Sequence, residues 1–119
     1  MKKTLVLGAS TNPIRYSNAA VHRLAQGGFE VVPVGVREGK ISGVTIEQGK
    51  PALENIHTIT LYLNPERQQE YYDYILSLNP KRIIFNPGTE NPELIRLARE
   101  KGIEVEMGCT LVMLAIGQY

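Results

Sequence analysis

Residues 4–13, TLVLGASTNP, decide the fold of this chain. The first four are apolar or β-branched and predict a short buried strand. The next six are rich in residues that form turns. Residues 17–26 then carry apolar side chains at helical spacing, with Ser17 as the expected N-cap. A strand, a glycine-containing turn and a helix in this order are typical of the opening unit of a βαβ fold.

Further apolar stretches along the chain predict strands that alternate with helices. The strands are expected at residues 29–34, 57–63, 82–85 and 103–105, with a small extra strand at 44–46. The helices are expected at residues 65–78, 92–101 and 109–116, with a short helix at 51–55. Such alternation is typical of a parallel sheet covered on both faces. We therefore predict an α/β fold: a Rossmann-like, three-layer, doubly wound sheet of five mostly parallel strands in the order 3-2-1-4-5.

Length and composition indicate one domain, which we place at residues 1–119. A hydrophobic content of 43% suits a core that needs no disulfide or metal. The net charge of +1 disfavours a nucleic-acid partner, because such domains usually carry a strong basic excess. The single cysteine, Cys109, favours a reducing compartment. With no signal region and no stretch long enough to cross a bilayer, we expect a cytoplasmic protein without a membrane partner. The oligomeric state stays open.

Two turn-rich loops are candidates for a ligand site. In a doubly wound sheet the ligand lies at the carboxyl ends of the strands, where the strand order reverses. For the order 3-2-1-4-5 this point falls between strands one and four, which are followed by residues 8–17 and 86–91. Gly8 permits a bend, Ser10 and Thr11 offer hydroxyls, and the next helix directs free N–H groups to the same place. We predict a phosphate cradle here. The alternative is a βα turn with no ligand.

The first loop lacks the glycine pattern of dinucleotide-binding folds. That pattern needs glycine at the first, third and sixth positions, which here are Gly8, Ser10 and Pro13. The acidic residue that would hold a ribose 2′-OH after the second strand is also missing, and the nearby charges are Arg37 and Lys40. A ligand with a phosphate on its ribose is therefore easier to accommodate than NAD. Coenzyme A and NADP both fit this description; alternatively, the two cations are solvated loop charges.

Short motifs lie at the ends of several expected strands or directly after them. They are GASTNP at residues 8–13, VPV at residues 32–34, LNPE at residues 63–66, Gly88 and Cys109. Together they resemble the stand-alone CoA-binding proteins of the Rossmann type, whose domain is similar to the amino-terminal domain of the succinyl-CoA synthetase alpha subunit. The resemblance extends over nearly the whole chain. The sequence departs from the family pattern at residues 35–37, where Gly-Val-Arg replaces an Asn-Pro step, and at Thr110, where a proline is more usual.

The resemblance implies that the protein binds coenzyme A or an acyl-CoA. It implies that residues 8–12 hold the pyrophosphate, that 32–34 pack near the adenine or its ribose, that 63–65 wall the adenine pocket and that 86–89 face the pantetheine arm. We also expect Arg15, beside the cradle, to contact a phosphate. The predicted cofactor-binding residues are Gly8, Ala9, Ser10, Thr11, Asn12, Arg15, Tyr16, Ser17, Val32, Pro33, Val34, Arg37, Leu63, Asn64, Pro65, Asn86, Pro87, Gly88, Thr89 and Cys109.

The sequence contains no recognisable set of nucleophile, base and orienting group. Cys109 precedes a predicted helix, where cysteines are often reactive, so disulfide exchange with the CoA thiol is one hypothesis and a small buried side chain is the other. His22 and His57 have no partner at metal-ligand spacing, so we predict no metal site. A CoA-binding carrier, sensor or regulator is favoured over an enzyme. The alternatives are a small NADP- or nucleotide-dependent enzyme and a ligand-free interaction domain.

Overall fold

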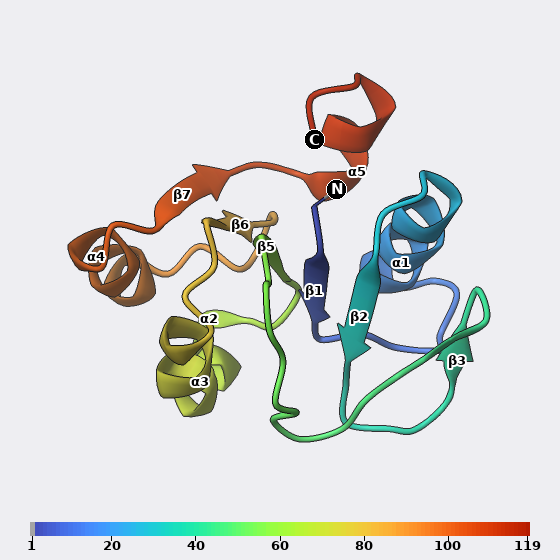
Figure 1. The fold of residues 1–119 in the computed structure, drawn as a ribbon, viewed down its shortest axis with the longest axis horizontal. Helices are drawn as coiled ribbons and strands as arrows, with labels where there is room; N and C mark the ends of the chain where they lie inside the picture. The colour runs from blue at the N-terminus through green and yellow to red at the C-terminus, as the bar shows by residue number, and fades with distance from the viewer. Residues whose placement is uncertain (1) are drawn as a thin grey trace.

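Five short strands form a parallel sheet between two layers of helices (Figure 1). The structure is a computed structural model and describes residues 2–119. The strands are β1 (Thr4–Leu7), β2 (Val31–Val34), β5 (Thr58–Leu61), β6 (Arg82–Phe85) and β7 (Glu104–Met107). Every residue of the first four is buried, as expected for strands covered on both faces, whereas the edge strand β7 is partly exposed.

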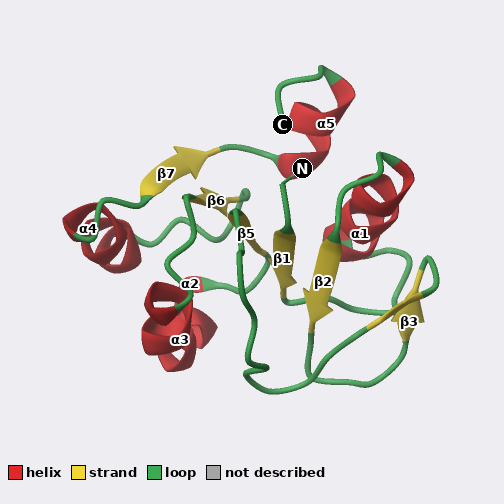
Figure 2. Cartoon of the chain, viewed as in Figure 1, coloured by secondary structure: helices red, strands yellow, loops and turns green. Residues whose placement is uncertain are grey.

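Helices cover both faces of this sheet, as the red and yellow layers of Figure 2 show. One face carries α1 (Tyr16–Gln26) and α5 (Thr110–Ala115); the other carries α2 (Pro65–Gln68), the 3₁₀ helix η1 (Gln69–Tyr71), α3 (Tyr72–Ser77) and α4 (Pro92–Glu100). Side chains alternate along β1, so Leu5 and Leu7 pack with Ile75 of α3 while Val6 packs with Val21 of α1. The predicted fold class, a doubly wound α/β sheet of Rossmann-like type, is confirmed.

The predicted strand order 3-2-1-4-5 is wrong in the position of the third core strand. That strand, β5, pairs with β1 and β6, so the order is β2-β1-β5-β6-β7. The connection from β2 to β5, residues 35–57, contains no helix; it forms the hairpin of β3 (Lys40–Ile41) and β4 (Val44–Thr45) and a bridge between Glu47 and Val34. This connection bridges part of the outer edge of β2, and β5 pairs on the other side of β1. The order therefore reverses between β1 and β5.

Three other local predictions are also wrong. The helix expected at residues 51–55 does not form: Asn55 has a left-handed φ of 59°, and the Pro51 carbonyl accepts a hydrogen bond from the Tyr74 hydroxyl at 2.6 Å. Ser17 is not the N-cap of α1, because the helix begins one residue earlier, after Arg15. The helix expected at residues 65–78 is divided into α2, η1 and α3. The expected small strand is present as β4, one half of the hairpin.

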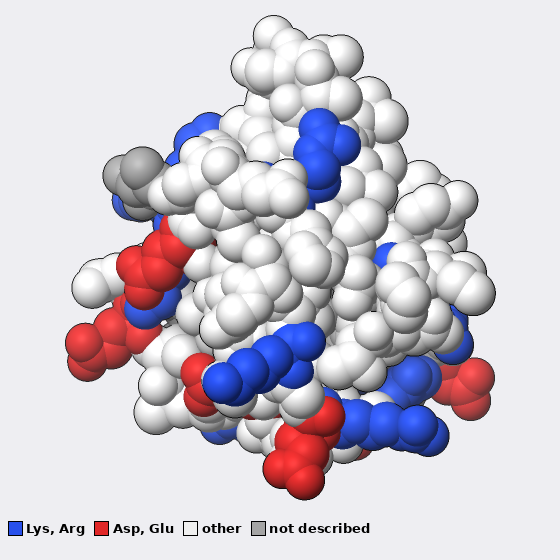
Figure 3. All heavy atoms as spheres, turned by 90° about the vertical axis from the view of Figure 1, so that its right-hand side faces the viewer, with Lys and Arg blue, Asp and Glu red and all other residues white. Residues whose placement is uncertain are grey.

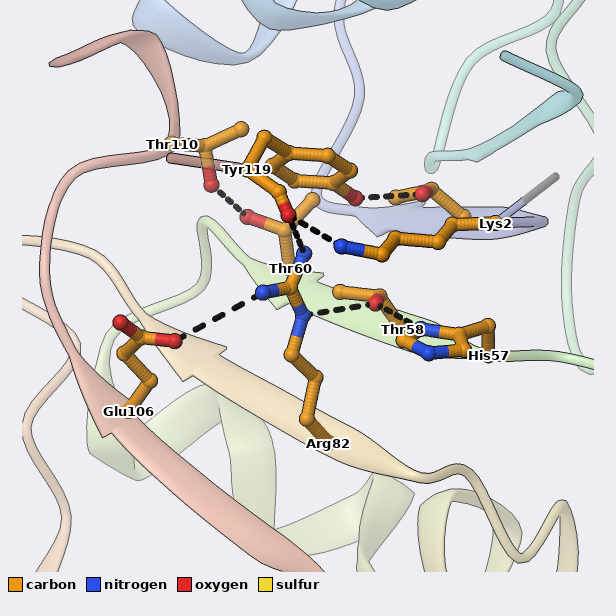
Figure 4. Close-up of polar contacts among 9 residues, drawn as sticks. Lys2, His57, Thr58, Thr60, Arg82, Glu106, Thr110 and Tyr119 are labelled. Atoms are coloured by element: carbon orange, nitrogen blue, oxygen red, sulfur yellow. Dashed lines mark hydrogen bonds and ion pairs between the residues drawn. The ribbon is translucent and has the colours of Figure 1, made fainter. Parts of the chain in front are cut away.

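Arg82 lies at the amino-terminal edge of the sheet, at the centre of a buried polar cluster (Figure 4). Its Nε donates to the Thr58 hydroxyl at 2.9 Å, and Nη2 donates to the backbone carbonyl of Tyr119 at 3.2 Å. Nη1 lies 3.7 Å from the Glu106 carboxylate, and the guanidinium is 4.4 Å from the centre of the Tyr119 ring. Lys2 donates to the same Tyr119 carbonyl. The cluster thus attaches the segment after α5 to the amino-terminal ends of the strands.

Charged side chains of both signs are mixed on the surface. On the face shown in Figure 3, Lys and Arg lie beside Asp and Glu in the lower half, and the upper part is mostly uncharged. Within residues 2–119, no helix has the length and apolar character that a membrane span requires.

Candidate functional site

A cleft of about 690 Å³ opens at the carboxyl-terminal edge of the sheet. It is lined by the loops that follow β1, β2, β5 and β6, and so includes the point where the strand order reverses. This is the usual place for a ligand in an open α/β sheet. Its volume falls within the range typical of small-molecule sites, about 300–1,000 Å³.

Most of the residues predicted from the sequence line this cleft. They are Gly8, Ala9, Ser10, Thr11, Asn12, Arg15, Tyr16, Ser17, Val34, Arg37, Leu63, Asn64, Pro87, Gly88 and Thr89. The others lie outside the lining: Val32 and Pro33 are buried within β2, Pro65 starts α2, Asn86 is buried behind the β6 loop, and Cys109 is half-buried before α5.

The structure adds residues to the cleft that the sequence did not indicate. They are Leu7, Gly35, Val36, Tyr62, Arg67 and Tyr71. The expected order 3-2-1-4-5 places the segment after the third strand away from the reversal, which is why Arg67 and Tyr71 escape prediction. In the observed order this segment directly adjoins the loop after β1. These two residues are therefore identified by the strand order of the structure, and no motif in the sequence marks them.

Two glycines allow the loops after β1, β2 and β5 to approach closely. Gly8 has a φ of +101°, and a Cβ on it would lie 3.0 Å from the carbonyl carbon of Tyr62. A Cβ on Gly35 would lie only 2.3 Å from the carbonyl oxygen of Ala9. The N–H groups of Gly8 and Ala9 both donate to the carbonyl of Val34 at 2.9 Å. Close packing of the loops therefore accounts for glycine at both positions.

The loop after β1 keeps some backbone N–H groups free and uses others internally. The Asn12 N–H donates to the Ser10 hydroxyl at 3.1 Å, and the Asn18 side chain donates to the Ser10 carbonyl at 2.9 Å. Within residues 2–119, no acceptor is found for the N–H groups of Ser10, Thr11, Tyr16 and Ser17. The last two belong to the first turn of α1, whose N–H groups favour an anion.

Three arginines line the cleft, and each is exposed: Arg15 after β1, Arg37 after β2 and Arg67 in α2. Among the residues that the structure describes, none of them has a carboxylate within 4 Å. No Asp or Glu belongs to the described lining of the cleft. Cations and free N–H groups that face one cleft without acidic neighbours attract an anionic ligand. The cleft is thus locally positive, although the net charge of the chain is only +1.

Asn86 does not offer its side chain to the cleft. The side-chain amide donates to the Thr60 hydroxyl at 2.6 Å and to the Leu61 carbonyl at 2.8 Å. Its Oδ1 accepts a hydrogen bond from the Thr110 backbone N–H at 2.9 Å. Asn86 therefore connects β6 to β5 and to the start of α5, and the residues after it line the cleft.

Tyr62 carries a buried hydroxyl for which no hydrogen-bond partner is found among the described residues. Burial raises the pKa of Tyr62 to about 12. The nearby hydroxyls of Thr60 and Thr110 partly oppose this shift, but they pair with each other at 2.7 Å.

Within residues 2–119, no group of three metal-ligating side chains occurs. His57 lies at the opposite edge of the sheet, where burial and the charge of Arg82 lower its pKa.

A doubly wound parallel sheet with an anion-attracting cleft at its reversal point defines a ligand-binding domain of the Rossmann-like class. Within this class, the chain belongs to the CoA binding domain family, whose model matches residues 2–115. The resemblance noted in the sequence is thereby confirmed. Membership of this family supports coenzyme A as the general class of ligand.

Similar solved structures match the whole chain or most of it. One, described as an uncharacterized protein, is 52% identical with a TM-score of 0.97, and the match covers 100% of this chain and 98% of that one. A conserved hypothetical protein from Pyrococcus furiosus is 26% identical with a TM-score of 0.77, covering 89% of this chain and 92% of its own. A hypothetical protein from Pyrococcus horikoshii is 23% identical, with a TM-score of 0.86 and coverage of 98% and 83%, and shows the fold alone. Among curated proteins, the comparison finds no match.

Proposed function

We propose that the protein binds coenzyme A or an acyl-CoA in the cleft between β1 and β5 and acts as a carrier, sensor or regulator. The observation that carries this proposal concerns the described residues 2–119: among them, the arginines of the cleft have no carboxylate partner, several backbone N–H groups beside them are free, and no acidic residue lines the cleft. Membership of the CoA binding domain family supports the same ligand.

The positions of the cations suit a ligand with two separate anionic groups. We propose that the diphosphate lies against the free N–H groups of Ser10 and Thr11 and the first turn of α1, beside Arg15. Arg37, after the neighbouring strand, is placed to bind the phosphate on the ribose. Coenzyme A carries both groups. NADP does as well, but the loop after β1 lacks the glycine pattern of folds that bind dinucleotides.

The loops after β5 and β6 would then contact the rest of the ligand. We propose that Leu63 and Asn64 wall the adenine pocket and that residues 87–89 face the pantetheine arm. Cys109 lies outside the lining of the cleft, so we assign it no part in binding.

Titration calorimetry with coenzyme A, dephospho-CoA, NADP and NAD tests this function. We expect coenzyme A to bind most tightly, and dephospho-CoA, which lacks the ribose phosphate, to bind about tenfold more weakly because a charge-assisted hydrogen bond is lost. The variant Arg37→Met should remove this difference. Arg23→Met, an exposed arginine of α1 outside the cleft lining, is the matched control and should retain it. Tighter binding of NADP than of coenzyme A would contradict the proposal, as would the absence of binding.

A further inference from the structure

We infer that Gln68 is a positioning residue for the cleft: it holds the wall after β5 at a fixed distance from the wall after β6. The inference rests on the proposed binding of coenzyme A. Gln68 belongs to α2, yet its relative exposure is 0%, although glutamine is usually exposed. Buried polar side chains are costly unless they are fully hydrogen-bonded, so the partners of this amide indicate its role.

The amide nitrogen of Gln68 joins the two walls of the cleft. Its Nε2 donates to the carbonyl of Leu63 at 2.8 Å and to the carbonyl of Thr89 at 2.9 Å. Leu63 follows β5, Thr89 follows β6, and both line the cleft. Both hydrogens of the amide are thereby used, one on each wall.

The amide oxygen of Gln68 fixes the orientation of the side chain. Its Oε1 accepts a hydrogen bond from the Asn91 side chain at 2.9 Å, and Asn91 also donates to the Tyr72 hydroxyl at 2.8 Å. The Oδ1 of Asn91 accepts from the Leu94 N–H at 3.3 Å and caps α4. Because each of these groups has a partner, the Gln68 amide cannot rotate without leaving buried groups unpaired.

The sheet itself does not hold these two walls together. The paired register of β5 and β6 ends at Leu61 and Phe85, and the cleft residues lie beyond that point. The wall after β5 carries Asn64, Arg67 and Tyr71, and its distance from the opposite wall sets the width of the cleft there. The hydrogen bonds of Gln68 thus replace the missing strand pairing where the ligand would lie.

The experiment compares Gln68→Met, which keeps the size of the side chain and removes both donors, with the control Thr4→Val. Thr4 is buried at the opposite edge of the sheet, where its hydroxyl is paired with that of Tyr119. In Gln68→Met we expect about a tenfold loss of coenzyme A affinity, but less than about a threefold loss for adenosine 3′,5′-diphosphate, which lacks the pantetheine arm facing the wall after β6. Thr4→Val should lower the melting temperature and leave both affinities unchanged.

Hydrogen exchange gives a readout that needs no ligand. In unliganded Gln68→Met, the backbone N–H groups of the two walls should exchange faster than in the wild type, whereas those of the loop after β1 should not. The wall groups are those of Leu63, Asn64, Glu66, Arg67, Gly88 and Thr89, because Pro65 and Pro87 have no N–H. Gln68→Leu, which likewise cannot donate to either carbonyl and buries no charge, should reproduce both results and serves if Gln68→Met does not fold. An equal loss of affinity for both ligands, or none, would overturn the inference while the proposed function stands. A wild type that binds no coenzyme A would overturn both.

Discussion

The two edges of the sheet use arginine in opposite ways. At the amino-terminal edge, Arg82 is buried and its guanidinium contacts Thr58, Tyr119 and Glu106. At the carboxyl-terminal edge, the arginines of the cleft are exposed, and none has a carboxylate partner among the described residues. A buried charge with partners on all sides contributes to the integrity of the fold, because removing it leaves those partners unpaired. Exposed cations without partners contribute little to stability and are available to a ligand.

The largest effect should come from Arg82→Met. The substitution leaves buried polar groups without a partner, and we expect the free energy of unfolding to fall by about 3 kcal/mol. Affinity for coenzyme A should be unchanged at temperatures where the variant is folded. Denaturant unfolding and calorimetry measure the two quantities, with Arg23→Met as the exposed control. If folded Arg82→Met binds coenzyme A more weakly, the amino-terminal edge contributes to binding as well as to stability, and the contrast between the two edges is wrong.

Gly35→Ala should affect both properties, because this residue packs the cleft loops together. Its Cβ would lie 2.3 Å from the Ala9 carbonyl oxygen, so the backbone must shift. We expect a loss of about 2 kcal/mol in stability, together with weaker coenzyme A binding. Gly28→Ala is the matched control for the loss of glycine alone: no described atom lies within 4 Å of its Cβ position, and its φ of +83° strains any side chain there. If the two variants bind coenzyme A equally well, the approach of the loops is not needed for the site.

Arg67→Met should lower the affinity for coenzyme A about tenfold, since one of the three cations that line the cleft is lost. Stability should change by less than about 0.5 kcal/mol, as is usual for an exposed side chain. Calorimetry at low and high salt is the measurement, and the difference from wild type should shrink at high salt. If the substitution changes the stability and leaves the affinity constant, Arg67 does not contribute to ligand binding.

The smallest effect at neutral pH should come from Tyr62→Phe, because the hydroxyl that it removes has no partner among the described residues. Since burial raises the pKa of Tyr62 to about 12, the folded state holds this proton more tightly than the unfolded chain does, where the pKa is about 10. The resulting stabilisation is complete below pH 10 and is lost as the pH rises from 10 to about 12. Unfolding measured across this range should therefore show a steeper loss for the wild type than for Tyr62→Phe. Parallel curves would contradict the burial of the hydroxyl.

The sequence was sufficient to predict the features that depend on neighbouring residues. The local pattern of residues 4–26 predicts a strand, a turn and a helix, with a bend at Gly8. The structure has all of these, and Gly8 has a φ of +101°. The strand order depends on the pairing of distant segments, here of β5 with β1 and β6, and this pairing has no signature in any one segment. Arg67 could not be assigned to the cleft without that order.

The side chain of Asn86 illustrates a second limit. An amide in a loop at the carboxyl end of a strand is a reasonable candidate for a ligand contact. Whether it faces the ligand or the protein depends on acceptors from other strands, here those of Thr60 and Leu61. The burial of the Asn86 side chain depends on how the strands assemble, so it cannot be predicted from a single sequence.

The connection between β2 and β5 also bears on the tendency of the chain to aggregate. Parallel sheets end in strands whose free N–H and carbonyl groups can recruit another chain. At the β2 edge, the backbone N–H of Glu47 donates to the Pro33 carbonyl at 2.9 Å, and the backbone carbonyl of Glu47 accepts from the Gly35 N–H at 3.0 Å. Part of that edge is therefore already occupied. At the β7 edge, Glu104 and Glu106 would bring like charges together if two copies paired there. Both borders of the sheet thus discourage intermolecular strand pairing, one by occupation and the other by repulsion.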